Sequence, residues 1–417
     1  MSPLPSHTIA SPWLHYCCQQ IEKGQWQEEQ LLQQLLEEPL PLIEEIAGQP
    51  EERLVTFLSI SCLPLHRYCL LGNGDLVAGP FTRVGQLRYL WSLTLTMPKD
   101  TCTGYGFIDE LPPWAIAPDG SFVLGEETGL LQLDPYNPHK LPLLPSRHTP
   151  PAATHLSALL LKSPSPLPLE GGLQQTLSID ETLWYSYKLA TGYRLQRLRL
   201  ASATKNRSAA YRQRCVLLLG GSRLLQDPVW LAELALLLTP STITSLFFLD
   251  IAAPTHPCNP LLAEALALEL VPHLQMHYGC SIDPWHLQLV GMGIHGLELL
   301  FALLRYPAHF RRVLALSPPM QWHPHFPEQK NWLLEQFLRT PPRPCQLQLA
   351  SGWLEKPVRP EQPGQGHRAY SASQYFVERT TQQGWTSQSI SYSGGHLLSD
   401  WGRLLLSQPH LWLLRAN

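Results

Sequence analysis

Charge is scarce in this sequence, and neither sign predominates. Charged residues make up 15% of the 417 residues, and the formal net charge is −3 at pH 7. Proteins that hold nucleic acid by its phosphates concentrate Lys and Arg on one face, and polybasic segments attract membrane surfaces. The composition therefore predicts neither a nucleic-acid partner nor a membrane partner.

Patterns that would indicate cross-linking, secretion or membrane insertion are also missing. The 9 cysteines include no CxxC pair, so we expect neither a zinc ribbon nor a disulfide framework, only buried thiols in a reducing compartment. Residues 1–20 lack a basic start followed by an apolar core, so no secretory signal is expected. The apolar run 231–238 is too short to cross a bilayer. Together these absences predict a cytoplasmic protein.

Hydrophobic residues and proline, by contrast, are plentiful. A 44% hydrophobic share supports a large buried core, and 417 residues exceed the roughly 250–300 that one core usually serves. The sequence therefore predicts two domains. The 40 prolines are about twice the usual share and gather in connecting stretches, which indicates many loops.

Changes in sequence texture divide the chain into four parts. Residues 1–52 include QEEQLLQQLLEE and are expected to be helical. Short β-branched and aromatic runs between turn residues predict a smaller, β-sandwich-like domain over residues 53–135. The Pro/Ser-rich stretch 136–175 is expected to be a linker, and residues 176–417 form the final domain.

The final domain alternates strand patterns with helix patterns. Buried-strand runs include RCVLLLGG, SLFFLDIA, HLQLVGMG, RVLALSPP and CQLQLASG, and apolar helical stretches such as GLELLFALLRYP separate them. Strands that alternate with helices of this length are joined by crossovers into a parallel sheet covered on both faces. We therefore predict a doubly wound, mostly parallel α/β sheet.

The segment VGMGIHG, residues 290–296, joins a predicted strand to a predicted helix. A nucleophile elbow needs such a sharp turn of small residues, usually GxSxG with the serine at its apex, and Gly293 occupies the apex here. The string also matches the dinucleotide fingerprint GxGxxG. It does not open the domain, however, and the next strand ends without an acidic ribose ligand. The elbow is favoured, and a glycine turn without chemistry remains the alternative.

Two other strand ends supply polar side chains in the chain order of an α/β-hydrolase. His396 follows the last strand on a glycine loop, where such enzymes place the general base. Glu355 follows CQLQLA and is placed to orient that histidine by accepting its Nδ1 proton. The alternatives are a surface histidine for His396 and a surface ion pair for Glu355.

The loop Gly220-Gly221-Ser222 ends the first buried strand. Backbone N–H groups of Gly221 and Ser222, together with that of Ile294 after the apex, are predicted to form an oxyanion hole. A plain turn is the alternative. Large aromatics at strand ends are more often packed in the core, but some line pockets. The predicted pocket-wall residues are Arg223, Trp230, Trp322 and Trp353.

Several segments, in the same order, resemble the enterochelin esterases. DPYNP is similar to DPLNP in that family, and HPCN followed by LALELVP is similar to its PCN and ELLP stretch. GMGIHGLELLFALLRYPAHFRRVLALS resembles GQSFGGLSALYAGLHWPERFGCVLSQS, and GGHLLSDW resembles GGHDALCW. LVTFLSIS and YGFIDEL resemble parts of the family's N-terminal β domain. The resemblance runs over most of residues 50–405.

This resemblance implies an α/β-hydrolase that cleaves the ester bonds of a ferric catecholate siderophore in the cytoplasm, with no cofactor. It implies that His396 is the base and Glu355 its acid partner. It also implies a catecholate siderophore or its precursor as ligand, and a protein of the siderophore pathway as a further partner.

The chain departs from the family where chemistry is expected. Gly293 stands at the nucleophile position, and glycine has no oxygen with which to form an acyl-enzyme. His295 replaces a glycine of the elbow, and Gly220 stands where the family has aspartate. The stretch APTHPCN also lacks the family's arginine, which weakens the affinity expected for an anionic ligand.

Three hypotheses follow. The favoured one is a non-catalytic esterase relative that binds a siderophore. The second is an active ester hydrolase that uses another nucleophile or a water molecule activated by His295 and His396. The third is a metal-binding protein, suggested by His323-Pro-His325. That spacing suits a shared metal poorly, so we predict no metal site.

Overall fold

The structure is a computed structural model of the full chain. It describes residues 11–37, 40–72, 76–109, 131–142, 155–161, 177–200, 214–238, 244–251, 258–281, 283–320, 322, 331–355, 369–395 and 397–413. The chain divides into two units. The first unit comprises residues 1–166, 357–366 and 393–397, and the second comprises residues 167–356, 367–392 and 398–417.

The first unit holds two antiparallel sheets. One has the order β1-β2-β6-β5, with β1 at Leu42–Glu45, β2 at Glu52–Ile60, β5 at Thr82–Arg83 and β6 at Leu90–Pro98. The other has the order β4-β3-β7-β9-β8, with β3 at Arg67–Leu71, β4 at Leu76–Ala78, β7 at Cys102–Asp109, β8 at Lys140–Pro142 and β9 at His155–Leu160. Aromatic rings join the sheets: the Phe57 ring centroid lies 4.9 Å from that of Tyr105.

The N-terminal part is not wholly helical as predicted. Helices α1, Pro12–Glu22, and α2, Glu28–Glu37, are present, but β1 follows at Leu42–Glu45 and pairs with β2. Proline at position 41 has no N–H for a helical hydrogen bond, and β1 alternates half-buried with exposed residues, which is the period of a strand.

Two strands lie within the predicted linker 136–175. The strand β9 pairs with β7 and with β8, so the sheet continues beyond residue 135. The DPYNP motif fixes this return of the chain. The Tyr105 hydroxyl donates to Asp134 Oδ2 at 2.6 Å, and Asn137 Nδ2 donates to the carbonyl of Ala158 at 2.7 Å. Buried polar groups of this kind need such partners, and the motif supplies them.

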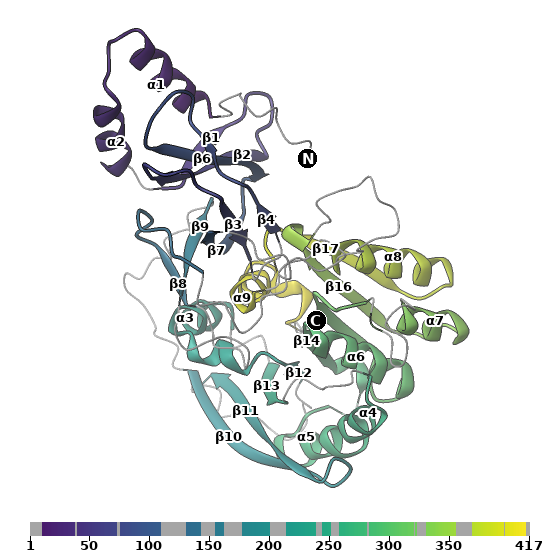
Figure 1. Ribbon diagram of the computed structural model, residues 1–417. Helices are drawn as coiled ribbons and strands as arrows, with labels where there is room; N and C mark the ends of the chain where they lie inside the picture. The colour runs from purple at the N-terminus through teal and green to yellow at the C-terminus, as the bar shows by residue number, and fades with distance from the viewer. Residues whose placement is uncertain are drawn as a thin grey trace. The chain divides into compact units, whose positions relative to one another are not determined.

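The second unit contains an eight-stranded mixed sheet with the order β10-β11-β13-β12-β14-β15-β16-β17 (Figure 1). The strands from β13 to β17 in this order are parallel, whereas β10 and β11 run antiparallel at one edge. Their bounds are Leu177–Ser186 for β10, Thr191–Leu200 for β11, Arg214–Leu219 for β12, Thr244–Asp250 for β13, Leu287–Met292 for β14, Arg312–Leu316 for β15, Gln346–Gly352 for β16 and Ser387–Tyr392 for β17.

Helices cover both faces of this sheet, as the alternating pattern predicts. One face packs against α4, Pro260–Ala265, α5, Val271–Tyr278, α6, Ile294–Arg305, α7, Trp332–Arg339, and α8, Ala369–Gln382. The other face packs against α3, Pro228–Leu237, and α9, Leu398–Ser407. Successive residues of each strand therefore enter opposite cores: Leu217 joins the first and Leu218 the second. No helix in the described part of the chain is long and apolar enough to cross a membrane.

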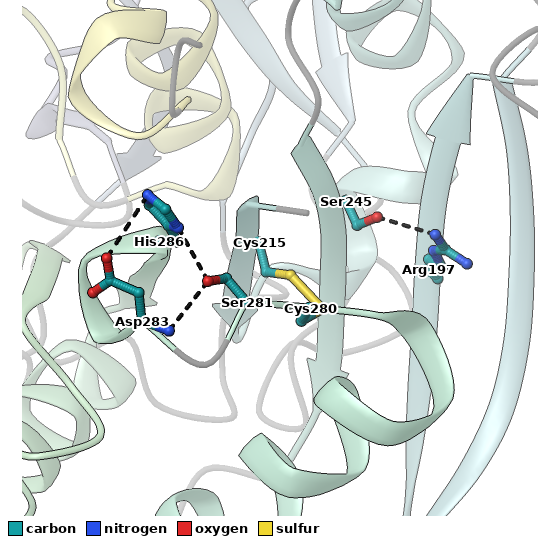
Figure 2. The surroundings of a disulfide bond; sticks show 7 residues. All are labelled: Arg197, Cys215, Ser245, Cys280, Ser281, Asp283 and His286. Carbon is teal, nitrogen blue, oxygen red and sulfur yellow. Dashed lines mark hydrogen bonds and ion pairs between the residues drawn. A yellow bond between two sulfur atoms is a disulfide. The ribbon is translucent and has the colours of Figure 1, made fainter. Parts of the chain in front are cut away.

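One pair of cysteines is bonded, contrary to the prediction of free thiols throughout. Cys215 at the start of β12 is joined to Cys280 after α5, and the other seven cysteines are free. Figure 2 shows the bond flanked by Arg197 and Ser245 on one side and by the loop of Ser281, Asp283 and His286 on the other. Sequence spacing did not reveal the pair because the fold, not a local motif, brings the two residues together.

We predict that this bond stabilises the second unit. A cross-link between residues 65 positions apart restricts the unfolded chain, so Cys215→Ala/Cys280→Ala should lower the free energy of unfolding by about 2–4 kcal/mol. Urea unfolding with and without a reducing agent measures this loss. Cys345→Ala, which removes a buried free thiol, is the control and should leave the effect of reductant unchanged. A wild-type protein whose stability does not respond to reductant would contradict the prediction.

Candidate functional site

The strand-to-helix turn at Gly293 has the shape of a nucleophile elbow. Gly293 alone separates β14 from α6, and its backbone has φ +56° and ψ −124°. Its N–H donates to the carbonyl of Leu316 on the neighbouring strand at 2.7 Å, which fixes the apex against β15. A positive φ is strained for residues with a side chain, and an elbow stores strain of this kind at its apex.

The outer glycines of the segment are required by close packing. A Cβ built on Gly291 would lie 2.5 Å from the carbonyl oxygen of His295 and 2.6 Å from the amide nitrogen of Gly296. A Cβ on Gly296 would lie 3.0 Å from that of Ala315. These distances leave no room for side chains, so the spacing of glycines on either side of the apex follows from the turn itself.

The apex carries no side chain, and an indole ring lies beside it. A Cβ at Gly293 would be 3.3 Å from Trp401 Cη2, with no other atom closer. Trp401 belongs to α9, and the sequence analysis did not single it out. A Cβ at the apex would therefore lie in tight contact with the edge of one ring, and the positive φ of Gly293 also favours glycine there.

The predicted oxyanion elements lie on adjacent strands. Leu219 at the end of β12 pairs with Gly291 of β14, and a Cβ on Gly221 would lie 3.0 Å from Met292 Cε. Ser222 begins the 3-10 turn Ser222–Gln226, and Ile294 begins α6. The fold thus brings the loop after β12 beside the turn after β14, and their role in binding an oxyanion stays a prediction.

His295 lies against this loop with its ring buried. The side chain is only 6% exposed, and its Cδ2 is 2.6 Å from the position that a Cβ on Gly220 would take. Within the described part of the chain, His295 Nδ1 has no hydrogen-bond partner. Loss of solvation lowers the pKa of His295 to about 4, although the charge of Asp250 acts in the opposite direction. The imidazole is therefore neutral at pH 7.

One turn further along α6, Glu298 is buried and holds the start of α4. Its Oε2 accepts the backbone N–H of Asn259 at 3.2 Å. Burial raises the pKa of Glu298 to about 7, and hydrogen bonds from the backbone of Asn259 and Cys258 partly offset the rise. Glu298 lies within an apolar helix and belongs to no motif, so its sequence does not mark it as a functional residue.

Glu355 is part of a buried hydrogen-bond network, not a surface ion pair. It ends the short turn Trp353–Glu355 after β16, and its Oε1 accepts from the backbone N–H of Gly352 at 2.6 Å. The Ser317 hydroxyl donates to the same oxygen at 2.7 Å and lies 3.0 Å from the hydroxyl of Tyr392. Trp401 Nε1 donates to Ser317 Oγ at 2.9 Å. Four strand or helix ends thus meet at one serine.

Ser317 itself has an unusual backbone. Its φ is +47°, which side chains rarely adopt, and it is 6% exposed at the end of β15. The network holds this strained conformation in place. The sequence places Ser317 at a strand end, but its partners lie on separate segments, so no local pattern reveals the network.

The predicted pocket-wall residues have different environments. Trp230 is buried between α3 and α9, and its Nε1 donates to the carbonyl of Gly402 at 3.1 Å, so it belongs to the core and not to a pocket wall. Trp322 packs on the opposite core, with its ring 5.8 Å from that of Trp332. Arg223 and Trp353 are half-buried near the strand ends and stay candidates.

The structure gives less information on the predicted base, His396, and on the predicted absence of a metal site. His396 lies outside the described residues, as do His323 and His325. Residues 393–397, the segment that contains His396, are grouped with the first unit. No group of three His, Cys, Asp or Glu side chains in the described ranges is placed to hold a metal ion.

Comparison with known proteins identifies the class. Residues 249–412 match the esterase family described as "Putative esterase". The enterobactin esterase Fes of Shigella flexneri, determined in the presence of enterobactin, has a TM-score of 0.60 and 20% identity, covering 90% of this chain and 97% of that chain. The ferric enterobactin esterase of Salmonella typhimurium has a TM-score of 0.60 and 19% identity, covering 88% and 97%.

A third structure, the Shigella flexneri esterase in the presence of 2,3-dihydroxy-N-benzoyl-serine, has a TM-score of 0.56 and 18% identity, covering 92% and 99%. No curated protein sequence is similar enough to count as a match. The chain therefore has an α/β-hydrolase-like fold. More particularly, it has the two-part fold of the enterobactin esterases, and the resemblance inferred from its motifs is confirmed.

The two shifted groups on α6 predict opposite effects of pH on stability. His295 has a folded pKa of about 4 against 6.5 ordinarily, so the unfolded chain binds more protons between these values and stability rises with pH. Glu298 has a folded pKa of about 7 against 4.5, so the folded chain binds more protons and stability falls as pH rises through that window.

In Glu298→Gln only the His295 shift remains, so the unfolding free energy should rise with pH between pH 4 and 6.5. In His295→Asn only the Glu298 shift remains, so the unfolding free energy should fall between pH 4.5 and 7. Each slope should reach about 1 kcal/mol per pH unit. Urea unfolding across this range measures both. If the two variants and the wild type share one pH profile, these pKa shifts are wrong.

The hydrogen bond between Ser317 and Trp401 should appear as an energetic coupling. Ser317→Ala leaves the indole N–H and one contact of Glu355 unsatisfied, so we expect a loss of about 1–3 kcal/mol in unfolding free energy. In a double-mutant cycle with Trp401→Phe, the loss in unfolding free energy of the double variant should differ from the sum of the two single losses by at least about 0.5 kcal/mol. Ser281→Ala, at the far ends of the strands, is the control and should add to Trp401→Phe. Additive losses for Ser317→Ala would contradict the network.

Proposed function

We propose that this protein is a siderophore-binding relative of the enterobactin esterases that does not use a serine nucleophile. One observation carries the proposal: the turn after β14 keeps the elbow geometry, while its apex, Gly293, has no side chain. Serine hydrolases form an acyl-enzyme through the apex oxygen, and loss of the nucleophile leaves only the roughly 10³–10⁴-fold catalysis given by binding and the oxyanion hole.

The buried hydroxyl of Ser317, at the end of the neighbouring strand β15, is poorly suited to replace it. Ser317 Oγ is engaged by Glu355, Tyr392 and Trp401, and the side chain is 6% exposed. To attack a carbonyl, this oxygen would have to leave a buried network and the backbone conformation that the network holds.

Water activated by His295 is also disfavoured. A general base works best when its pKa is near the working pH, and a pKa of about 4 makes the imidazole a weak base at pH 7. His295 Nδ1 is buried as well, so it does not face a water-filled space. His396 keeps its role as proposed base only by its position in the sequence.

The proposed ligand is a catecholate siderophore or a catecholate precursor. Relatives of the same fold were crystallised with enterobactin and with 2,3-dihydroxy-N-benzoyl-serine. Half-buried Arg223 supplies a cation near the strand ends, where a parallel sheet of this kind places its site. We place the protein in the cytoplasm, in siderophore metabolism, where a protein of that pathway is its proposed partner.

The proposal predicts binding without cleavage. Purified wild-type protein is incubated with iron-free and with ferric enterobactin, and the products are followed by liquid chromatography with mass detection. Tryptophan fluorescence is titrated in parallel, because Trp401 lies at the apex. We expect saturable quenching and intact trilactone. Linear products well above a protein-free control would contradict the proposal that the protein is non-catalytic. Absence of saturable binding would contradict the proposed catecholate ligand.

A further inference from the structure

Two of the departures from the family motifs touch one another. Position 220 has lost a side chain relative to the family's aspartate, and position 295 has gained one relative to its glycine. The ring atom His295 Cδ2 lies 2.6 Å from where a Cβ on Gly220 would be, which is closer than real Cβ contacts allow. A side chain at 220 and the imidazole at 295 therefore compete for the same space.

The space in question adjoins the predicted oxyanion loop. Gly220 and Gly221 follow β12, which pairs with β14, the strand leading to the elbow. The imidazole is 6% exposed, its Cδ2 lies 2.6 Å from where a Cβ on Gly220 would be, and its Nδ1 has no hydrogen-bond partner among the described residues, so the ring occupies the space beside Gly220. An oxyanion hole needs open space in front of its N–H groups, so a ring packed beside Gly220 is placed to restrict access to the adjoining loop.

We propose that His295 closes the oxyanion loop, that Gly220 permits it to do so, and that the missing nucleophile is therefore only one of two separate blocks to ester hydrolysis. The closure rests on the proposed function, because it assumes that this loop once served an oxyanion. It adds that Gly293→Ser alone does not restore reactivity, and that the imidazole must also be removed.

The steric part of the proposal is tested without reference to activity. Thermal unfolding is compared for wild type, Gly220→Ala, His295→Ala and the double variant. Gly220 has φ +82°, so alanine is strained there in either background, but the clash with the ring exists only when His295 is present. The drop in Tm caused by Gly220→Ala should be larger, by roughly 3 °C or more, in the wild type than in His295→Ala.

His277→Ala removes an exposed imidazole from α5 and is the matched control. The drop caused by Gly220→Ala should be the same with and without it. Equal drops in the wild-type and His295→Ala backgrounds would show that the ring and position 220 do not compete, and the inference would fail.

The chemical part uses a fluorophosphonate probe and intact-protein mass measurement. In the expected reaction, the introduced hydroxyl oxygen bonds to phosphorus, fluoride leaves, and the hydroxyl proton passes to solvent. Gly293→Ser/His295→Ala should label at least tenfold faster than Gly293→Ser, while wild type and His295→Ala should not label at this position. A double variant no more reactive than Gly293→Ser would overturn the closure. Cleavage of enterobactin by the wild type would instead overturn the proposed function and leave the competition between positions 220 and 295 measurable.

Discussion

The arrangement of the second unit depends on how closely the backbone of β14 approaches that of α6. At Gly291 the gap is too small even for a methyl group, because the carbonyl of His295 and the N–H of Gly296 lie against it. Glycine at 291 permits this close approach, and Gly293 alone makes the turn between β14 and α6, with the ring of Trp401 beside it. The pairing of β12 with β14 places the loop after β12 near this turn, and the hydrogen bond from Trp401 to Ser317 holds the indole there.

Three buried polar side chains of the second unit differ in how far hydrogen bonds compensate for their loss of solvation. Glu355 is satisfied by a backbone N–H and a hydroxyl, so its carboxylate has compensation for the loss of water. Glu298 has weaker compensation from the start of α4, and the pKa of its carboxyl rises to about 7. His295 has none among the described residues and is kept neutral, with its pKa lowered to about 4.

The parallel sheet could be predicted because its strands are buried on both faces and read as apolar runs ending in glycine. The strand β1 was missed because LIEE looks like a continuation of an acidic helix, and β9 was missed because prolines surround it. At the candidate site, the positions of Gly293 and Glu355 at strand ends could be predicted from the sequence, whereas their roles stay predictions. The hub at Ser317 and the contact between His295 and Gly220 could not, because they join strands that only the three-dimensional fold brings together.

The bond between Cys215 and Cys280 has a mechanical consequence. It encloses β13, α4 and α5 in a covalent ring, so force applied at the chain ends cannot extend the intervening residues while the bond is intact. For a separation of 65 residues, at roughly 3.4 Å per residue, about 220 Å of contour length is withheld from a stretched chain. Residues 216–279, which include β13 and most of β12, are thus shielded from tension applied at the chain ends while the bond is intact.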